Sequence, residues 1–371
     1  MYSQQELDEA VAAGVISPEA VDSLREYMAQ QRTAIPDEEQ FRLLTGFNDI
    51  FVTIAAAILL FALGWIGQSI GQSAGLVVDV DGPSPLAPLF VAAAAWGLAL
   101  FFTAKRRMAL PSILLMLAFV GGVLMTAAFT FVLAIGPDQF NDNANNNMIG
   151  GIVAAASAGI AAVAAWFHWR RFRVPITIAA GAAAVTGLAV SLLIAALGTA
   201  AENSENLILG FVLMLGIGVF LFAMWWDSSD RARLTRRSDV AFWLHLLAAP
   251  MIVHPIFTLL GLSQGNVSLG GGLAAVVLYI GLGLTALAID RRALLVSALA
   301  YVLWALAELF KKFGAVELNV ALTALVIGSA LLLLSAFWHQ ARAAIVRPLP
   351  DGLKARLPIL DRTVPATQPA A

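Results

Sequence analysis

The sequence predicts an all-α integral membrane protein, and three features of its 371 residues support this fold class. Hydrophobic residues make up 60% of the chain and charged residues 12%, against the roughly 45–50% and about 25% that are usual in soluble domains. The apolar residues gather in ten long runs, each close to or above the roughly 17 residues that a helix needs to cross about 30 Å of hydrocarbon. The basic residues lie almost entirely on one side of these runs.

The N-terminal segment, residues 1–36, is predicted to form a short cytoplasmic helical hairpin. A Ser-x-x-Glu capping box at residues 3–6 begins a first helix, which Gly14 ends. Ser17 then caps a second helix that has Pro18 and a glutamate in its first turn. A hairpin of this size buries little surface, so we expect it to lean on a cytoplasmic protein partner, a second copy of the chain or the bilayer.

Residues 37–340 are predicted to form a ten-helix transmembrane domain. The predicted helices are 50–67, 86–104, 110–135, 148–169, 174–197, 207–226, 240–262, 269–289, 293–310 and 318–338. Residues 341–371 follow the last apolar run, and we expect them to form a disordered cytoplasmic tail.

The distribution of lysine and arginine predicts the orientation. The connections on one side of the predicted bundle hold only Lys311 and Lys312, and the other twenty of the 22 basic residues lie on the opposite side. Because basic residues in short loops are retained in the cytoplasm, both termini are predicted to be cytoplasmic. These twenty residues are Arg25, Arg32, Arg42, Lys105, Arg106, Arg107, Arg170, Arg171, Arg173, Arg231, Arg233, Arg236, Arg237, Arg291, Arg292, Arg342, Arg347, Lys354, Arg356 and Arg362.

Arginine pairs recur at positions 106–107, 170–171, 236–237 and 291–292. Each pair follows an outward helix, a polar loop and a returning helix. We interpret the pairs as the stop that every helical hairpin needs, with gene duplication as the alternative.

Small residues recur at four-residue spacing on one face of two predicted helices. Such stripes let helix backbones approach closely in the membrane, so they are predicted to be packing seams; a gliding interface between two bundles is the alternative. The stripes are Gly151, Ala155 and Gly159 in the fourth helix and Gly187, Ser191 and Ala195 in the fifth.

The seventh predicted helix carries the candidate residues for a substrate or proton pathway: His245, Pro250, His254 and Pro255. Each proline removes a backbone donor, so we expect a break or kink near these positions. Titratable groups at membrane depth are functional candidates, although His254 can instead satisfy a carbonyl that Pro255 leaves free. The two histidines are nine residues apart and face different sides of the helix, so they are not expected to share a metal ion.

The ninth predicted helix adds Tyr301, Trp304 and Glu308, which share one helix face. Lys311 and Lys312 follow within reach of Glu308. An interfacial salt bridge is one interpretation of this group, and an entry site for a cation or proton is the other.

Several functional classes are excluded or left without support. The chain has no cysteine, which excludes disulfides and thiolate chemistry. It contains no phosphate-binding glycine loop and no HExxH helix. We therefore predict no catalytic residue, no metal, no cofactor and no nucleic-acid partner.

Two N-terminal segments resemble a family of bacterial membrane proteins catalogued as a domain of unknown function. The turn at residues 14–19, Gly-Val-Ile-Ser-Pro-Glu, is similar to a Gly-Ile-Ile-Ser-x-Glu turn in that family's cytoplasmic helical hairpin. Residues 37–49 resemble alphaproteobacterial members of such groups. The resemblance covers about 50 residues, and it implies a bacterial inner-membrane protein without an established activity.

The sequence leaves more than one function open. A small-molecule transporter or permease-like protein is the leading hypothesis, and a membrane scaffold or sensor that recruits a cytoplasmic partner through residues 1–36 is the alternative. An intramembrane enzyme acting on lipid has no motif behind it. A transporter should have a cavity near the midplane lined by the seventh helix, whereas a scaffold should be packed shut.

Overall fold

The computed structural model describes residues 11, 13–23, 47–79, 82–140, 146–231, 233, 235–261, 269–292, 294–295, 299, 303 and 319–360. Within these residues every regular element is a helix and none is a strand, which confirms the predicted all-α class. Residues 42–358 form one compact unit, and residues 1–41 together with 359–371 form a second.

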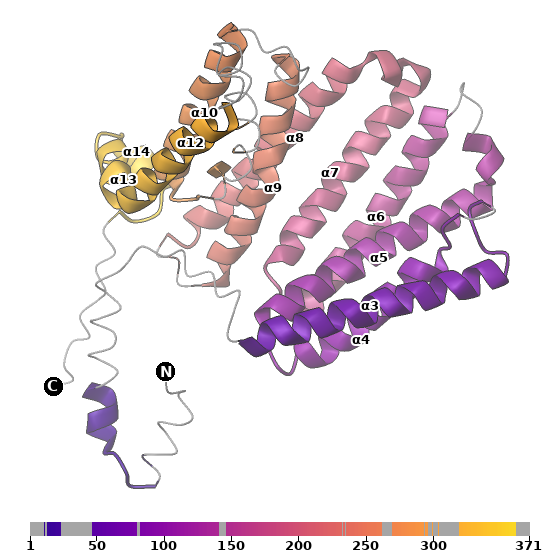
Figure 1. Cartoon of the computed structure of the whole chain (residues 1–371), viewed down its shortest axis with the longest axis horizontal. Helices are drawn as coiled ribbons and strands as arrows, with labels where there is room; N and C mark the ends of the chain where they lie inside the picture. Colours follow the sequence, from indigo (N-terminus) through magenta and orange to yellow (C-terminus); the bar gives the residue numbers. More distant parts are fainter. Residues whose placement is uncertain are drawn as a thin grey trace. The chain divides into compact units, whose positions relative to one another are not determined.

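Figure 1 shows the described helices of the larger unit in their order along the chain. They are α3 (Phe47–Ser73), α4 (Leu86–Phe102), α5 (Ala109–Ile135), α6 (Asn146–Phe172), α7 (Ile176–Leu197), α8 (Glu205–Ser228), α9 (Arg236–Leu259), α10 (Leu269–Ile289), α12 (Asn319–Ala336), α13 (Trp338–Val346) and α14 (Asp351–Lys354). Short 3-10 turns, η1 (Pro137–Phe140) and η2 (Gly198–Asn203), follow α5 and α7. Nine of the ten predicted segments coincide with described helices, and the remaining one, 293–310, lies largely outside the described residues.

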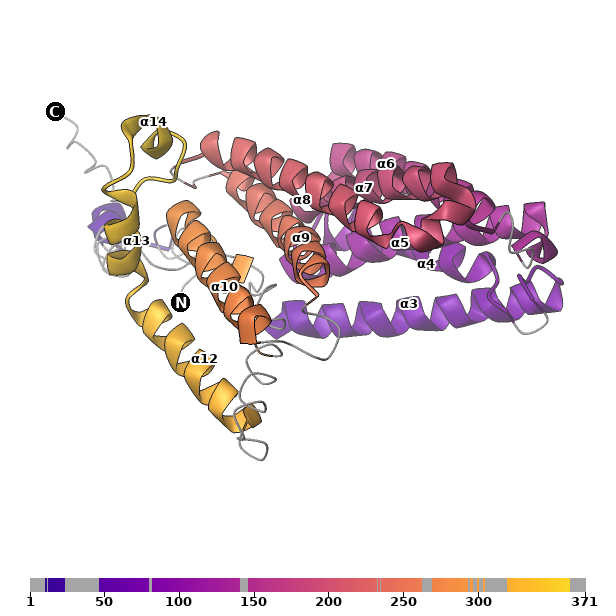
Figure 2. The same cartoon turned by 90° about the horizontal axis from the view of Figure 1, so that it is seen from above.

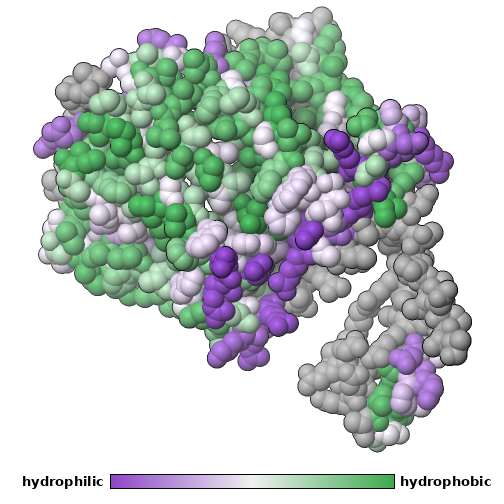
Figure 3. Space-filling view, turned by 180° about the vertical axis from the view of Figure 1, so that it is seen from behind, coloured by the Kyte–Doolittle hydropathy of each residue, from purple (hydrophilic) through white to green (hydrophobic). Residues whose placement is uncertain are grey.

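Six of the described helices, α3 and α5 to α9, are long and apolar enough to cross a membrane, where the sequence predicted ten spans. The helices α12 and α13 meet at a 75° bend and would add a seventh span if they were counted together. The helices α4 and α10 are apolar but have shorter apolar stretches. Apolar side chains cover much of the face in Figure 3, and Phe61 and Trp65 of α3 are 73% and 69% exposed. A bilayer would cover such a surface, so the structure supports a multi-pass membrane protein.

Four connections place a residue other than glycine in the left-handed region. These residues are Arg107 after α4, Arg173 after α6, Arg233 after α8 and Asp290 after α10, with φ between 54° and 57°. That conformation costs about 1–2 kcal/mol for a residue with a Cβ. The helices joined by the first three of these turns, α4/α5, α6/α7 and α8/α9, also pack on one another most extensively. The recurrent unit is therefore two helices joined by a tight basic turn.

The two predicted stripes of small residues lie against each other where α6 packs on α7. A Cβ atom on Gly151 would lie only 2.7 Å from the Ala195 backbone nitrogen and 2.8 Å from the Ser191 carbonyl oxygen. A Cβ atom on Gly159 would lie 3.2 Å from a Leu188 methyl carbon, and one on Gly187 would lie 4.0 Å from the Ala158 Cβ. Close packing of backbones therefore holds this helix pair together.

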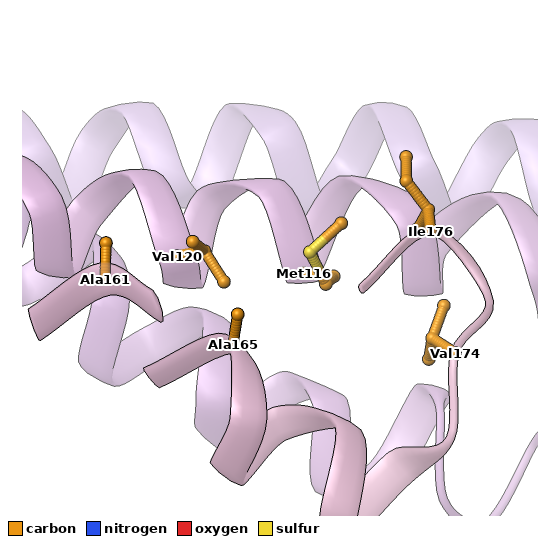
Figure 4. Close-up of a cluster of buried hydrophobic side chains, with 6 residues drawn as sticks. All are labelled: Met116, Val120, Ala161, Ala165, Val174 and Ile176. Atoms are coloured by element: carbon orange, nitrogen blue, oxygen red, sulfur yellow. The ribbon is translucent and has the colours of Figure 1, made fainter. Parts of the chain in front are cut away.

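Alanines on α6 also let α5 approach closely. Ala161 and Ala165 face Met116 and Val120 of α5, and the start of α7 closes the cluster with Val174 and Ile176 (Figure 4). Met116 is fully buried and Ala161 is 1% exposed. Branched and unbranched side chains thus fill the space that two small residues leave.

The helix α9 is the most enclosed of the six candidate spans, since half of its apolar window is buried. Both Pro250 and Pro255 lie inside it, yet α9 is a single helix from Arg236–Leu259. A break is therefore absent, and a kink of the helix axis at these prolines stays a prediction. Gly216 of α8 lies directly against Met251, where a Cβ atom would come within 2.9 Å of the Met251 backbone, and this close support from a neighbouring helix lets a membrane helix tolerate proline.

The C-terminal helices meet α9 on its other side. Val253 and Phe257 of α9 are buried with Ile327 of α12, and Leu278 and Leu282 of α10 pack against this cluster. Figure 2 shows α10 and α12 beside α9, with α13 turned away from the axis of α12. We expected residues 341–371 to be a disordered tail, but α13 and α14 extend into that range. Trp338, Arg342 and Val346 explain the difference, because their side chains recur every four residues along α13 and are buried.

The described part of the smaller unit agrees with the predicted helix caps. Gly14 has a φ of 68°, and its N–H donates to the Val11 carbonyl. The Ser17 hydroxyl accepts a hydrogen bond from the Ala20 N–H at 3.1 Å. Hydrogen bonds from its own backbone N–H and from Ser17 lower the pKa of the Glu19 carboxyl below its ordinary value of 4.5.

Candidate functional site

A buried ion pair joins the end of α8 to the turn that follows α10. The Asp227 side chain is fully buried, and the Arg291 side chain is 3% exposed. Arg291 donates from Nη2 to Asp227 Oδ1 and from Nε to Asp227 Oδ2, the latter at 3.2 Å. The same Nη2 donates to the Ser238 carbonyl at 3.0 Å and its hydroxyl at 3.1 Å, so it also reaches the first turn of α9. A buried carboxylate requires such pairing, because an isolated charge is very costly to remove from water.

His245 of α9 completes this group. Its Nε2 lies 3.3 Å from Asp227 Oδ2, and the whole residue is 0% exposed. Because a carboxylate held by arginine only accepts hydrogen bonds, Nε2 carries the proton and Nδ1 carries the lone pair. Nδ1 is buried and has no hydrogen-bond partner among the residues that the structure describes. The ring of Phe220 from α8 lies edge-on at 5.2 Å. We call Asp227, His245 and Arg291 the buried triad.

A second ion pair lies beside the buried triad and connects α10 to α13. Arg233 donates from Nη1 to Asp290 Oδ2 at 3.0 Å and from Nη2 to the Ile289 and Asp290 carbonyls, each at 2.9 Å. The Trp338 indole donates to Asp290 Oδ1 at 2.8 Å. The left-handed turns at Arg233 and Asp290 are therefore the places where α8, α9, α10 and α13 are tied together.

The segment after α13 is held by arginine as well. Arg231 donates to the Lys354 carbonyl at 3.0 Å and the Leu357 carbonyl at 2.8 Å, and Arg342 donates to the Pro358 carbonyl at 2.8 Å. The Arg231 bonds join main-chain oxygens near α14 to the α8–α9 connection, and the Arg342 bond joins Pro358 to α13. The basic residues of this end of the unit thus bind parts of the chain itself.

A second buried histidine lies elsewhere in the same unit. His168 of α6 is 1% exposed, and its Nδ1 lies 3.1 Å from the Thr177 hydroxyl of α7. The rings of Trp96, Phe119 and Phe172 surround it at 6.2, 5.8 and 4.7 Å. Among the described residues, its Nε2 is buried without a hydrogen-bond partner. The ring is therefore enclosed by aromatic side chains and held by a single hydrogen bond.

The residues predicted from the sequence are distributed differently. His245 lies in the buried triad, whereas His254 is on the exposed side of α9. Pro250 is exposed and Pro255 is buried. The remaining candidates, Tyr301, Trp304 and Glu308, lie outside the described residues.

Sequence reasoning missed two members of the buried triad. Asp227 was not among the predicted site residues, and Arg291 was predicted only as part of the basic stop after a helical hairpin. The sequence signal that could have indicated this ion pair is an acidic residue next to the tryptophans at the end of α8. Arginines stand at the ends of other helices on the same predicted side and are its possible partners. Ionisable groups at such depth pair with one another.

The described residues contain no group of three or more His, Cys, Asp or Glu side chains that could hold a metal ion. A shallow apolar groove of about 390 Å³ lies between α3 and α4 and is lined by Leu60, Phe61, Gly64, Trp65, Gln68 and Val91. It lies away from α9. The chemistry available at the buried triad is therefore charge pairing and proton binding.

No protein-family model matches the chain, and neither a curated protein nor a solved structure is significantly similar to it. The resemblance of residues 14–19 and 37–49 to a bacterial membrane-protein family therefore stays a prediction.

Proposed function

We propose that this protein is a multi-pass protein of the bacterial inner membrane that acts as a membrane scaffold or sensor. In this proposal residues 1–36 recruit a cytoplasmic protein or a second copy of the chain. The observation that carries the proposal is the closed packing of α9 around the buried triad. Ala248, Ala249 and Val253 continue the His245 side of α9, and each is 0% exposed.

The proposed orientation places the ends of α8, α10 and α13 in the cytoplasm. Its support is that Arg231, Arg233, Arg291 and Arg342, which are far apart in the sequence, all bind neighbouring parts of the chain at this end of the unit. Lysine and arginine near the ends of spans favour the cytoplasmic side.

Small-molecule transport is the second candidate function, and the buried triad is also the observation that favours it. Ionisable side chains between membrane helices often belong to a substrate or proton pathway. Prolines in a spanning helix fit a helix that borders a cavity. The closed side of α9 among the described residues favours the scaffold or sensor.

Cysteine accessibility tests these alternatives, because the chain contains no cysteine of its own. Ala249→Cys places a thiol on the closed side of α9, and Ser229→Cys places one at an exposed position after α8. A scaffold or sensor is expected to leave position 249 unreacted with a water-soluble maleimide while position 229 reacts. Reaction at position 249 that a transported solute then blocks would establish transport instead.

The same reagent tests the orientation. Gln139→Cys lies at an exposed position in η1, on the side opposite to Ser229→Cys in the predicted topology. In intact spheroplasts position 139 should react with an impermeant maleimide, and position 229 should react only after lysis. The reverse pattern would refute the proposed orientation.

A further inference from the structure

The Nδ1 atom of His245 takes no part in the hydrogen bonds of the buried triad. Among the described residues it is buried and unpartnered, although the other nitrogen of the same ring is held by Asp227. Moving the proton from Nε2 to Nδ1 is unfavourable, because a bare Nε2 would then face a carboxylate oxygen. The hydrogen bonds of the described residues thus leave one lone pair inside the unit with no donor beside it.

We propose that this lone pair is a proton-binding site and that its loading loosens the contact between α8 and the turn after α10. The proposal deepens the proposed sensor function, on which it rests, by naming the proton as the signal. The step is simple: a proton from water binds His245 Nδ1 and gives an imidazolium, and no other covalent bond forms or breaks.

The charges around the ring determine the effect of this proton. The elements packed on the ring contribute Asp227 from α8, Arg233 from the α8–α9 connection and Arg291 from the turn after α10. Before protonation, Asp227 and Arg291 compensate each other and the imidazole is neutral. After protonation, one carboxylate faces two neighbouring cations, and the nearby Arg233 is already paired with Asp290. The buried triad then has an uncompensated positive charge away from water, which is strongly unfavourable.

Arg291 is the member of the buried triad that can relieve this charge. His245 and Asp227 belong to α9 and α8, which pack together extensively along their length. Arg291 belongs to a short turn after α10, and α10 meets α9 through the apolar cluster of Val253, Phe257 and Ile327. Moving Arg291 towards water lets His245 keep Asp227 as its counterion. Proton binding therefore favours separation of the α10–α13 part from α8 and α9 at the basic end.

Spin labels across this contact test the proposal on the whole protein in lipid nanodiscs. Ser229→Cys after α8 and Gln340→Cys in α13 are both exposed positions and carry the labels. When the pH is lowered, the distance distribution should shift to longer values and broaden. His245→Gln keeps a donor towards Asp227 and removes the second nitrogen, so this shift should disappear. The matched control, His339→Gln on the exposed side of α13, should retain it.

Nitrogen NMR of histidine gives a readout that does not depend on the variant folding. The chain has four histidines, and the His245 signals are assigned by their loss in His245→Gln. The expected result is a neutral ring with the proton on Nε2 near neutral pH that becomes an imidazolium as the pH falls. A ring that stays neutral at every pH at which the protein is folded, or a distance shift that persists in His245→Gln, would overturn the proposal.

The two proposals fail separately. Solute-protected labelling at position 249 would remove the scaffold or sensor function and leave proton binding at His245 standing. A sealed position 249 with a His245 ring that does not titrate would remove the proton site alone.

Discussion

Replacing Arg291 by methionine should destabilise the protein far more than replacing both partners of its ion pair. The Arg291→Met variant leaves the carboxylate of Asp227 buried at 0% side-chain exposure with only His245 as a donor. Breaking a buried pair in this way costs about 3–5 kcal/mol. The structure favours the upper half of this range, because Arg291 also donates twice to Ser238.

The double variant Asp227→Leu with Arg291→Met should recover most of that loss. Two apolar side chains of similar volume need no hydrogen-bond partner, and such replacements are often neutral or stabilising by about 1–4 kcal/mol relative to the pair. His245 then loses its acceptor, so we expect a remaining cost of about 1–2 kcal/mol for its unpaired N–H. The double variant should therefore be more stable than Arg291→Met by about 2–4 kcal/mol.

Denaturant unfolding in mild detergent, followed by circular dichroism, measures these free energies. The exposed pair of Lys354 and Asp351, at 3.4 Å, provides the control, and Asp351→Asn should leave the unfolding midpoint unchanged. If Arg291→Met were as mild as the control, Asp227 would not be buried as described. If the double variant were as unstable as the single one, the loss would come from packing and not from an unpaired charge.

Three further predictions concern the packing, the turns and the N-terminal segment. Gly151→Ala should cost about 1–3 kcal/mol of unfolding free energy, whereas Gly150→Ala, which meets nothing within 4 Å, should cost little; equal effects would contradict the close approach of α6 and α7. Arg107→Gly should leave stability unchanged or raise it by about 1 kcal/mol by relieving a left-handed backbone, but Arg233→Gly should lower it because an ion pair is lost. The pKa of the Glu19 carboxyl is lowered in the folded state, so the ionised carboxylate stabilises the folded N-terminal segment above pH 4.5, and this stabilisation is lost as the pH falls through the folded pKa. Carboxyl NMR, with Glu19→Gln for assignment, should show this titration. An ordinary pKa would contradict the predicted helix cap.

The helical class and most helix positions could be predicted because they depend on local properties of the chain. Apolar runs of sufficient length must satisfy their backbone hydrogen bonds within themselves, and the helix is the local way to do so. The end of a helix at Gly14 and the cap at Ser17 follow from backbone freedom and from one side-chain acceptor, which are also local. The stripe of Gly151, Ala155 and Gly159 shows a face that allows close approach, whichever helix comes against it.

The prediction about α9 shows where local reasoning stops. Proline at positions 250 and 255 lowers the local preference for a helix, yet the helix is continuous because Gly216 of α8 gives it close support. His245 and His254 look equivalent in the sequence, but one lies at 0% exposure and the other on the exposed side. Which face of a helix is enclosed depends on its neighbours.

Composition and the order of apolar and charged residues along the chain determined an all-helical membrane protein whose basic residues gather at one end of its helices. Only the tertiary structure decided that Asp227, His245 and Arg291 meet, because residues that are 18 and 64 positions apart come together through the packing of whole helices. It also decided that Arg231 and Arg342 hold the chain after α13. The physical reason is the sequence distance over which each interaction acts. Hydrophobic runs and helix caps depend on residues close together in the sequence, whereas the partner of a buried charge can come from any segment that the fold places next to it.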